Sequence, residues 1–274
     1  MTDHRDRAST REDRLAELGL LPQWRLRSRS GLGNASYAAN PRAGEPILAP
    51  ESAAAPLSAR GERDVPAPAP GGDDADARLT RIATLDWSTF AADVDACTAC
   101  KLCSTRHRSV PGVGDVAADW LFVGEAPGAE EDARGEPFVG QAGRLLDNML
   151  AALGLARGKR VYIANVLKCR PPGNRTPEPR EVDSCLPYLD RQIELIQPRL
   201  IVALGKSAAT SLLQVDATIG SLRGRVHRYR DVPLIVTYHP AYLLRNLADK
   251  AKAWEDLLLA RRTLAALPPK PDST

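Results

Sequence analysis

Four short apolar runs along the chain predict the strands of one sheet. They are WLFVG at 120–124, VYIANV at 161–166, RLIVALG at 199–205 and PLIVTY at 233–238. Runs of this length with little polar alternation are typical of strands that are buried on both faces. The stretches AGRLLDNMLAALGL, PEPREVDSCLPYLDRQIELIQ and KSAATSLLQ lie between them with helical patterns, and AKAWEDLLLARRTLAAL follows the last run. This alternation predicts an α/β fold in which helices cover both faces of a central parallel sheet of about four strands.

The sequence around this pattern sets the expected limits of the folded domain. The segment LTRIATLDWSTFAADVDAC is expected to form a helix that leads into Cys97. We therefore place the folded domain at residues 79–268. The remaining residues, PKPDST at 269–274, are expected to be a disordered tail.

The sequence before the domain divides into two parts. Residues 1–28 contain an amphipathic stretch with Leu15, Leu18 and Leu21 on one side and Trp24 beyond them, which predicts a short docking hook. Residues 29–78 are rich in Ala, Pro and Gly and cannot bury enough apolar surface to fold, so a disordered linker is expected. An unstructured tail with a chance apolar cluster fits the first part equally well.

Composition narrows the class of protein without fixing its activity. The 274 residues are 43% hydrophobic and 26% charged, which is enough apolar sequence for a sizeable core. The net charge of +3 neither requires nor excludes nucleic acid. No apolar run approaches the roughly 20 residues that span a bilayer, and the charged N-terminus has no signal-peptide core, so a cytoplasmic protein without membrane contact is expected. In a reducing compartment the five cysteines indicate metal or redox chemistry before disulfides.

A glycine-rich, acidic loop follows the first predicted strand. Its sequence, GEAPGAEEDARGEPFVGQAG at 124–143, leads from that strand into a helix. The carboxyl edge of an open α/β sheet is where such folds bind ligands. The acids Glu125, Glu130, Glu131 and Asp132 are therefore expected to form the rim of a pocket, with Phe138 as a flat apolar wall. A surface loop with solvated acids is the alternative.

Two further strand ends carry polar side chains. Asn165 lies inside an apolar strand, where an unpaired amide is costly, so it either reads the edge of a base-like ligand or pairs with neighbouring backbone. His239 ends the fourth run and is a candidate because it reaches the same sheet edge. Leu244 and Arg245 behind it form either a helix start packed in the core or an apolar wedge with a phosphate clamp.

Basic residues are concentrated in two segments. KCRPPGNRTP at 168–177 is stiffened by prolines, and its Lys168, Arg170 and Arg175 offer charge to phosphates, although an ordinary solvated turn is the alternative. RGRVHRYR at 223–230 either attracts a nucleic-acid backbone or forms a solvated hairpin.

Four cysteines have the spacing of a metal site. Cys97 and Cys100 form a CxxC pair, Cys169 follows the second predicted strand, and Cys185 lies in a predicted helix. Four thiolates suit either zinc or an iron–sulfur cluster, and the sequence chemistry does not separate the two. Buried free cysteines that act as small hydrophobic residues are the alternative, which fits Cys103 well.

Taken together, these motifs resemble the family 4 uracil-DNA glycosylases, the iron–sulfur branch of the uracil glycosylase superfamily. The resemblance rests on GEAPGAEEDARGEPFVG, NVLKCRPPGNR, HPAYLLR and the order of the four cysteines, and it covers about Cys97 to Leu264. It implies a three-layer α/β/α sandwich and a [4Fe–4S] cluster held by Cys97, Cys100, Cys169 and Cys185. It also implies a base excision repair enzyme that hydrolyses the N-glycosidic bond of uracil in DNA, releasing uracil and leaving an abasic site. The long N-terminal extension departs from the family's short form.

The same resemblance implies a role for each pocket residue. Phe138 would stack on a flipped uracil, and Asn165 would hydrogen-bond to its polar edge. Glu125 would position the hydrolytic water, with Glu131 as a second acid. His239 would donate to uracil O2 as negative charge builds on the leaving base, the step at which preorganised donors matter most.

The remaining implied roles concern the pocket backbone and the DNA. Backbone at Ala126 and Gly128 would line the pocket, and Leu244 and Arg245 would lie in the loop that enters the duplex. Uracil-containing DNA is thus the expected partner of a monomer. Two rivals stay open, namely a non-catalytic iron–sulfur DNA-binding module recruited to the replication machinery and a zinc protein with another hydrolytic activity.

The predicted hook carries a second, separate resemblance. TREDRLAELGLLPQWRLR is similar to the N-terminal peptide of the psi subunit of the DNA polymerase III clamp loader, which docks through a tryptophan. It implies that Trp24 tethers the protein to a clamp loader or another replication protein.

Overall fold

A six-stranded sheet forms the centre of the protein. The computed structural model describes residues 72–270, so the predicted hook and most of the predicted linker lie outside the described residues. The strand order is β1-β3-β2-β4-β6-β5. The strands are β1 (Val113–Gly114), β2 (Trp120–Gly124), β3 (Val161–Asn165), β4 (Leu200–Leu204), β5 (Val226–Tyr229) and β6 (Val232–Thr237). The four central strands are parallel, as predicted, and the antiparallel edge strands β1 and β5 add to them.

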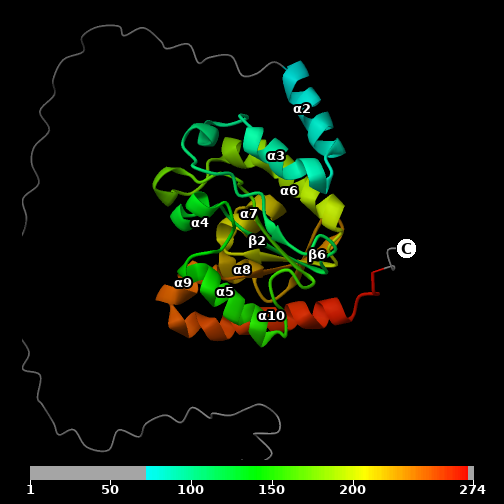
Figure 1. Ribbon diagram of the computed structural model, residues 1–274. Helices are drawn as coiled ribbons and strands as arrows, with labels where there is room; N and C mark the ends of the chain where they lie inside the picture. Colours follow the sequence, from blue (N-terminus) through cyan, green and yellow to red (C-terminus); the bar gives the residue numbers. More distant parts are fainter. Residues whose placement is uncertain (1–71, 271–274) are drawn as a thin grey trace, which may run out of the picture. The chain divides into compact units, whose positions relative to one another are not determined.

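Side chains alternate between the two faces of the sheet and build two cores. On one face, Leu121 and Val123 of β2 pack with α6 (Pro179–Ile196) and α7 (Lys206–Leu213). On the other face, Trp120 and Phe122 pack with residues of α5 (Gln141–Ala152) and α10 (Lys250–Ala265). Figure 1 shows the sheet between these helical layers. The three-layer α/β/α arrangement is therefore confirmed.

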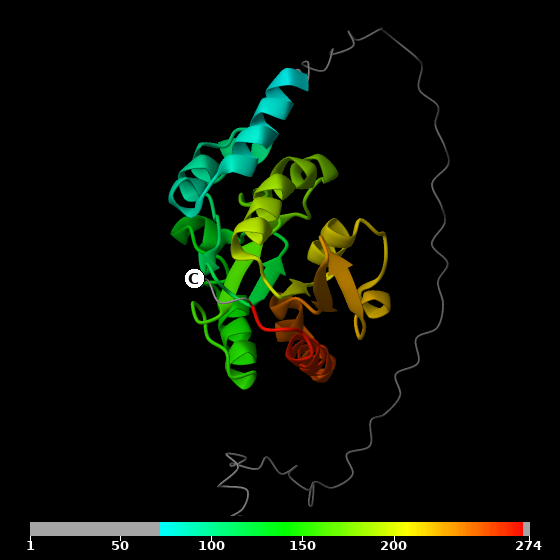
Figure 2. The same ribbon diagram turned by 90° about the vertical axis from the view of Figure 1, so that its right-hand side faces the viewer.

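The segment before the cysteines contains two helices where one was predicted. α2 (Gly72–Thr84) and α3 (Trp87–Ala96) are separated at Asp86, whose carboxylate accepts hydrogen bonds from the N–H groups of Ser88 at 2.9 Å and Thr89 at 3.0 Å. This N-cap starts a new helix. The predicted domain start at residue 79 falls inside α2, so the boundary is corrected to include that helix, which projects from the rest of the domain in Figure 2.

Short helical segments occupy several of the connections between the longer elements. They are η1 (Lys101–Ser104), α4 (Ala129–Arg134), η2 (Pro172–Asn174), α8 (Ile219–Leu222), α9 (Pro240–Arg245) and η3 (Leu247–Asp249). Among them, α4 lies inside the acidic loop that was expected to be irregular, and α9 begins directly after His239. The segments α4, η2 and α9 follow β2, β3 and β6, so they lie at the carboxyl edge of the sheet.

The basic run at 223–230 forms part of a hairpin. Arg230 and Asp231 turn between β5 and β6 with positive φ angles of 44° and 62°, and the Arg230 guanidinium pairs with Asp190 at 2.8 Å. Arg223 pairs with the buried Asp256 at 3.0 Å. The run thus lies in a hairpin, as one alternative predicted, and both of these arginines are engaged within the domain. Attraction of the run for a nucleic-acid backbone stays a prediction.

The end of the described chain packs against the amino edge of the sheet. Lys270 was predicted to lie in a disordered tail, but its Nζ donates to the carbonyls of Ala117 at 3.0 Å, Ala118 at 3.2 Å and Ile196 at 2.6 Å. Because these carbonyls flank the starts of β2 and β4, Lys270 holds the chain end there. None of the helices described between residues 72 and 270 is long and apolar enough to cross a membrane.

Candidate active site

A cavity of ≈ 490 Å³ lies at the carboxyl ends of the parallel strands, and we call it the strand-end pocket. It brings together residues from the loops after β2, β3 and β6, as predicted from the sequence. Its lining contains Glu125, Ala126, Pro127, Gly128, Glu131, Phe138, Ala142, Asn165, Pro171, Asn174, Arg175, His239, Ala241, Tyr242 and Arg245. Distant parts of the chain thus meet at one sheet edge, where open α/β folds bind ligands.

The back of the strand-end pocket depends on a glycine in β2. Gly124 pairs in register with Asn165 of β3. A Cβ atom at Gly124 would lie 2.4 Å from Asn165 Oδ1 and 2.7 Å from Phe138 Cζ, closer than atoms can approach without displacement. The absence of a side chain therefore lets the amide and the aromatic ring converge at the same point. Phe138 itself has a positive φ of 55°, an uncommon backbone conformation that its surroundings must hold.

Asn165 carries a buried polar atom without a partner. The residue is 2% exposed, and no described group hydrogen-bonds to its side-chain oxygen Oδ1. Its backbone carbonyl, in contrast, accepts from Lys168 Nζ at 2.8 Å. The alternative that this side chain simply pairs with neighbouring backbone leaves Oδ1 unexplained. An unsatisfied buried acceptor facing a cavity indicates a ligand that donates to it.

Lys168 differs from its predicted role. Its side chain was expected to offer charge to phosphates, but the residue is only 1% exposed. Its Nζ also donates to Gln192 Oε1 at 2.5 Å, and burial lowers its pKa to about 8. Lys168 therefore braces the end of β3 from the inside of the protein and cannot reach a phosphate.

His239 presents a neutral imidazole to the pocket. Its Nδ1 accepts a hydrogen bond from the N–H of Ala241 at 3.1 Å and caps α9. Burial lowers the pKa of His239 to about 4, so the ring is uncharged near neutral pH. Because Nδ1 is the acceptor, the single ring proton lies on Nε2, which makes that atom a donor. The ring stacks on Phe138 with centroids 5.5 Å apart.

The two carboxylates of the pocket have different surroundings. Glu125 is half-buried, and burial raises its pKa while a hydrogen bond with Ser207 opposes the rise. Glu125 also lines an adjoining cavity of ≈ 630 Å³, as does His239. The carboxylate of Glu131 instead accepts from three backbone N–H groups, those of Gly128 at 3.1 Å, Val139 at 3.0 Å and Gly140 at 3.3 Å. Glu131 thereby fixes the loop on either side of Phe138.

The other two acids of this loop are not part of the rim, which corrects the prediction of four. Glu130 is exposed and lies 3.9 Å from Arg134 of the same helix. Asp132 is 1% exposed and its carboxylate faces His107 instead of the pocket. The reason is α4, whose helical period turns successive side chains in different directions, whereas an irregular loop was expected.

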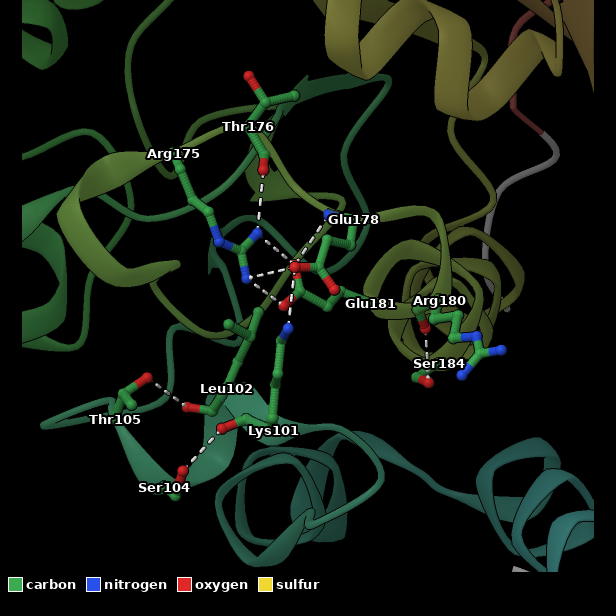
Figure 3. A network of polar contacts seen from close by, with 10 residues as sticks. All are labelled: Lys101, Leu102, Ser104, Thr105, Arg175, Thr176, Glu178, Arg180, Glu181 and Ser184. Carbon is green, nitrogen blue, oxygen red and sulfur yellow. Dashed lines mark hydrogen bonds and ion pairs between the residues drawn. The ribbon is translucent and has the colours of Figure 1, made fainter. Parts of the chain in front are cut away.

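The basic residues of the loop after β3 are paired within the protein. Arg175 lines the pocket, but its guanidinium donates to both oxygens of the buried Glu181, at 2.9 Å and 2.5 Å (Figure 3). Arg170 donates to Asn174 Oδ1 at 2.7 Å. Neither guanidinium is as free as the sequence suggested. On α9, by contrast, Leu244 is 41% exposed and Arg245 is exposed at the pocket mouth.

The four predicted cysteines converge beside the pocket, and we call them the cysteine site. Cys169 and Cys185 are buried in an apolar cluster, and Cys97 and Cys100 pack against it as half-buried residues. All four are free thiols. N–H groups point at three of the sulfurs: Arg106 Nη1 lies 2.9 Å from Cys169 Sγ, the backbone N–H of Lys168 lies 3.2 Å from Cys185 Sγ, and Arg78 Nη2 lies 3.8 Å from Cys97 Sγ. Donors aimed at sulfur are the surroundings that thiolate ligands of a metal require.

The geometry of the cysteine site does not match a compact single-ion site. No group of three or more His, Cys, Asp or Glu side chains in the described part of the chain is arranged to hold one metal ion. The same four thiols still form one cluster, and the mutual proximity of Cys100, Cys169 and Cys185 helps burial raise the pKa of Cys185 to about 12. Cys103 lies in η1 and is half-buried, outside this set of four.

Sequence reasoning missed two residues that shape the pocket. Ser207 hydrogen-bonds with Glu125, and its place after β4 at the same sheet edge was the available signal. Arg157 donates to the carbonyls of Pro137 at 2.9 Å and Phe138 at 2.5 Å from a loop after α5. No sequence pattern marks Arg157, because its partners are backbone atoms that any residue could supply.

The described part of the chain is similar to known proteins. The sequence profile of the uracil DNA glycosylase superfamily matches residues 111–258. A type-4 uracil-DNA glycosylase of Archaeoglobus fulgidus is 48% identical over 160 residues, which cover 56% of this chain and 80% of the relative. One of Thermotoga maritima is 45% identical over 161 residues, covering 58% and 83%. A type-5 uracil-DNA glycosylase of Pyrobaculum aerophilum is 35% identical over 155 residues, covering 51% and 68%.

Proposed function

The chain belongs to the type-4 uracil-DNA glycosylases of the uracil-DNA glycosylase superfamily, and from this premise we propose that the strand-end pocket binds a uracil flipped out of DNA. The N-glycosidic bond is hydrolysed there, which releases uracil and leaves an abasic site. The observation that carries the proposal is the buried, unpartnered Oδ1 of Asn165 beside Phe138 and His239. Extrusion of the base costs a few kcal/mol, which the pocket must repay by specific contacts.

Asn165 selects the base in this proposal. Uracil carries an N3–H donor between two carbonyl acceptors, so the Asn165 amide can accept from N3–H and donate to the adjacent carbonyl. Cytosine has no proton at N3 and would leave Oδ1 unpaired, a cost that a buried polar group makes large. Phe138 offers the apolar face on which the base stacks, a contact that does not depend on base identity.

His239 stabilises the departing base. As the bond breaks, negative charge develops on uracil and positive charge on the sugar. A neutral imidazole with its proton on Nε2 donates a hydrogen bond to uracil O2, and it needs no loss or gain of a proton to do so. The hydrogen bond from Ala241 to Nδ1 fixes this tautomer.

The two carboxylates act in different ways. Glu125 borders the pocket with a half-buried carboxylate that faces Ser207, a position suited to orient the attacking water and to oppose the positive charge on the sugar. Glu131 is a positioning residue, since its carboxylate is engaged by three backbone N–H groups and holds Phe138 in place. This refines the expected role of Glu131 as a second acid.

The cysteine site holds a [4Fe–4S] cluster in this proposal. Cys97, Cys100, Cys169 and Cys185 would be its ligands, because these four side chains gather in one apolar cluster and thiolates are the ligands that such clusters take. When bound, the cluster supplies iron–thiolate bonds that cross-link the segments after α3 and β3 to α6. Those segments lead into the strand-end pocket, so the role is structural.

Contacts with DNA follow from the exposed residues at the pocket mouth. Leu244 enters the duplex near the vacated position and Arg245 meets a phosphate, while Arg170 and Arg175 contribute less because both have internal partners. The protein acts as a monomer in the cytoplasm, a compartment that suits five cysteines that form no disulfide. The Trp24 hook and its clamp-loader partner lie outside the described residues and stay predictions.

The experiment is a strand-cleavage assay on matched oligonucleotides that contain a single uracil or thymine. The purified full chain should release uracil and leave alkali-labile sites only in the uracil substrate. Iron and acid-labile sulfide are measured on the same sample and should be present in equal amounts, about four of each per chain. Binding of the uracil substrate without cleavage would favour the non-catalytic DNA-binding module. Zinc in place of iron would contradict the proposed cluster.

A further inference from the structure

A buried carboxylate that the proposed chemistry does not use joins the cysteine site to the strand-end pocket. Asp132 is 1% exposed and lies in α4, immediately after Glu131. Its Oδ1 accepts from the backbone N–H of His107 at 2.9 Å, and its Oδ2 lies 2.9 Å from His107 Nδ1. A carboxylate accepts only, so the ring nitrogen facing it carries a proton. Asp132 is thus fully engaged with a single residue.

The loop that carries His107 is held at the cysteine site by its preceding residue. Arg106 Nη1 lies 2.9 Å from Cys169 Sγ, and Arg106 Nη2 also donates to the carbonyl of Asp95 at the end of α3. Val110 lies three residues after His107, and its N–H donates to the carbonyl of Lys168 at 2.8 Å. This loop therefore takes its position from the chain segments around the cysteines.

On the pocket side, Asp132 is next to the residue that fixes Phe138. The Glu131 carboxylate holds the N–H groups of Val139 at 3.0 Å and Gly140 at 3.3 Å. Phe138 has a positive φ of 55° and persists only where its surroundings determine it. Movement of α4 would release these two N–H groups and with them the Phe138 ring.

We infer that Arg106, His107 and Asp132 form a positioning relay through which an occupied cysteine site fixes the strand-end pocket. The path runs from Cys169 to Arg106, along the backbone to His107, across to Asp132, and through Glu131 to the loop at Phe138. Each link is either a contact described above or a pair of neighbouring residues in the chain. The inference rests on the proposed cluster, and it adds that the cluster acts on the pocket through α4.

The test is amide hydrogen exchange at Val139 and Gly140 in the full chain, with and without the cluster, which is removed by an oxidant and a chelator. In the unaltered protein, cluster removal should speed this exchange about tenfold, the size expected for one lost hydrogen-bonded support. In Asp132→Ala, exchange should already be fast with the cluster in place, and its removal should add little. His107→Ala should behave in the same direction, and its ring is 78% exposed, so folding is not at risk.

Arg157→Ala provides the matched control. Arg157 holds the same loop through the carbonyls of Pro137 and Phe138 but has no contact with the relay. Arg157→Ala should also speed exchange at Val139 and Gly140. Cluster removal from this variant should then speed the exchange further by the same factor as in the unaltered protein. The relay is overturned if cluster removal leaves Val139 and Gly140 unchanged, or if it adds the same factor in Asp132→Ala as in the unaltered protein.

Iron content and uracil release, measured on the same samples, distinguish failure of the relay proposal from failure of the cluster proposal or of the proposed activity. If the protein holds iron and releases uracil but cluster removal does not change the exchange of Val139 and Gly140, only the relay proposal is contradicted. If the protein is isolated without iron, the cluster proposal and the relay proposal are both contradicted. A protein that holds iron and shows the coupled exchange without uracil release supports the relay and contradicts the proposed activity.

Discussion

The strand-end pocket and the cysteine site lie side by side, and a buried polar side chain of each is satisfied to a different extent. In the pocket, Asn165 keeps a buried side-chain oxygen without a partner. Around the cysteine site, the buried Glu181 is satisfied by Arg175 and by the N–H of Glu178 at 2.8 Å. An unmade hydrogen bond costs stability, and a base bound in the pocket would complete the one at Asn165. The open acceptor of Asn165 suits a site that binds a ligand, and the satisfied carboxylate of Glu181 suits a site that stabilises the fold.

The network in Figure 3 shows how the bracing is built. Lys101, next to Cys100, pairs with Glu178 at 2.8 Å, and Arg175 pairs with Glu181 of the helix that carries Cys185. These contacts link the cysteine-bearing segments even without a metal. Substitutions of single residues test this difference, and the expected effects on catalysis decrease from the pocket residues to Glu181.

The largest effect is expected for Asn165→Ala. Loss of the amide removes the groups that read the uracil edge, so kcat/KM should fall by about 10³-fold, as in sites that lose a buried recognition contact. Single-turnover release of uracil measures it. Asn148→Ala, at an exposed position on α5, is the control and should change the rate by no more than about twofold. Equal effects of the two substitutions would contradict the assignment.

His239→Ala should lower kcat by about 10²-fold with less change in KM, because the donor acts mainly as charge develops. The unaltered enzyme should show no loss of rate from this residue as pH falls until it nears 4, since the pKa of His239 lies at about 4 and not at its usual 6.5. Between those values the unfolded chain binds a proton that the folded protein does not, so stability falls as pH falls through this window. A rate limb near 6.5 that vanishes in His239→Ala would refute a neutral imidazole.

Phe138→Ala should have a smaller effect, about 5- to 150-fold on kcat/KM, which corresponds to the 1–3 kcal/mol of base–aromatic stacking. Most of it should appear in KM, because stacking contributes to binding before the bond breaks. Phe138→Tyr retains the ring and serves as the control. If both variants match the unaltered enzyme, the base does not stack on this residue.

The smallest effect on catalysis is expected for Glu181→Gln in the brace. It should reduce the free energy of unfolding by about 1–3 kcal/mol and leave kcat/KM within about twofold. Hydrogen bonding to Arg175 lowers the pKa of Glu181, so this stabilisation is present above the ordinary value of 4.5 and is lost as pH falls below it. Urea unfolding at pH 7 and pH 3 measures both. The exposed Glu178→Gln, in the same network, should cost at most about 1 kcal/mol.

The sequence predicted those parts of the molecule that depend on strand ends. Buried apolar runs located β2, β3, β4 and β6, and the rule that parallel strands present their carboxyl ends at one edge brought Asn165 and His239 together. The edge strand β1 has only two residues and leaves no periodic signal.

The errors arose where side-chain direction depends on short local structure. The acidic loop was expected to be irregular, so the turn of α4 that sends Asp132 away from the pocket could not be foreseen. Lys168 and Arg175 were assigned to phosphates by charge alone. Both side chains are paired with residues of α6: the buried Lys168 donates to Gln192, and Arg175 donates to Glu181.

The anchoring of Lys270 at the starts of β2 and β4 has a practical consequence for measurement. A fluorophore or a surface linker attached just beyond this residue would leave the opposite rim of the sheet clear for a nucleic acid to approach. Single-molecule recordings of the enzyme scanning a tethered duplex could then use that attachment point without obstructing the encounter.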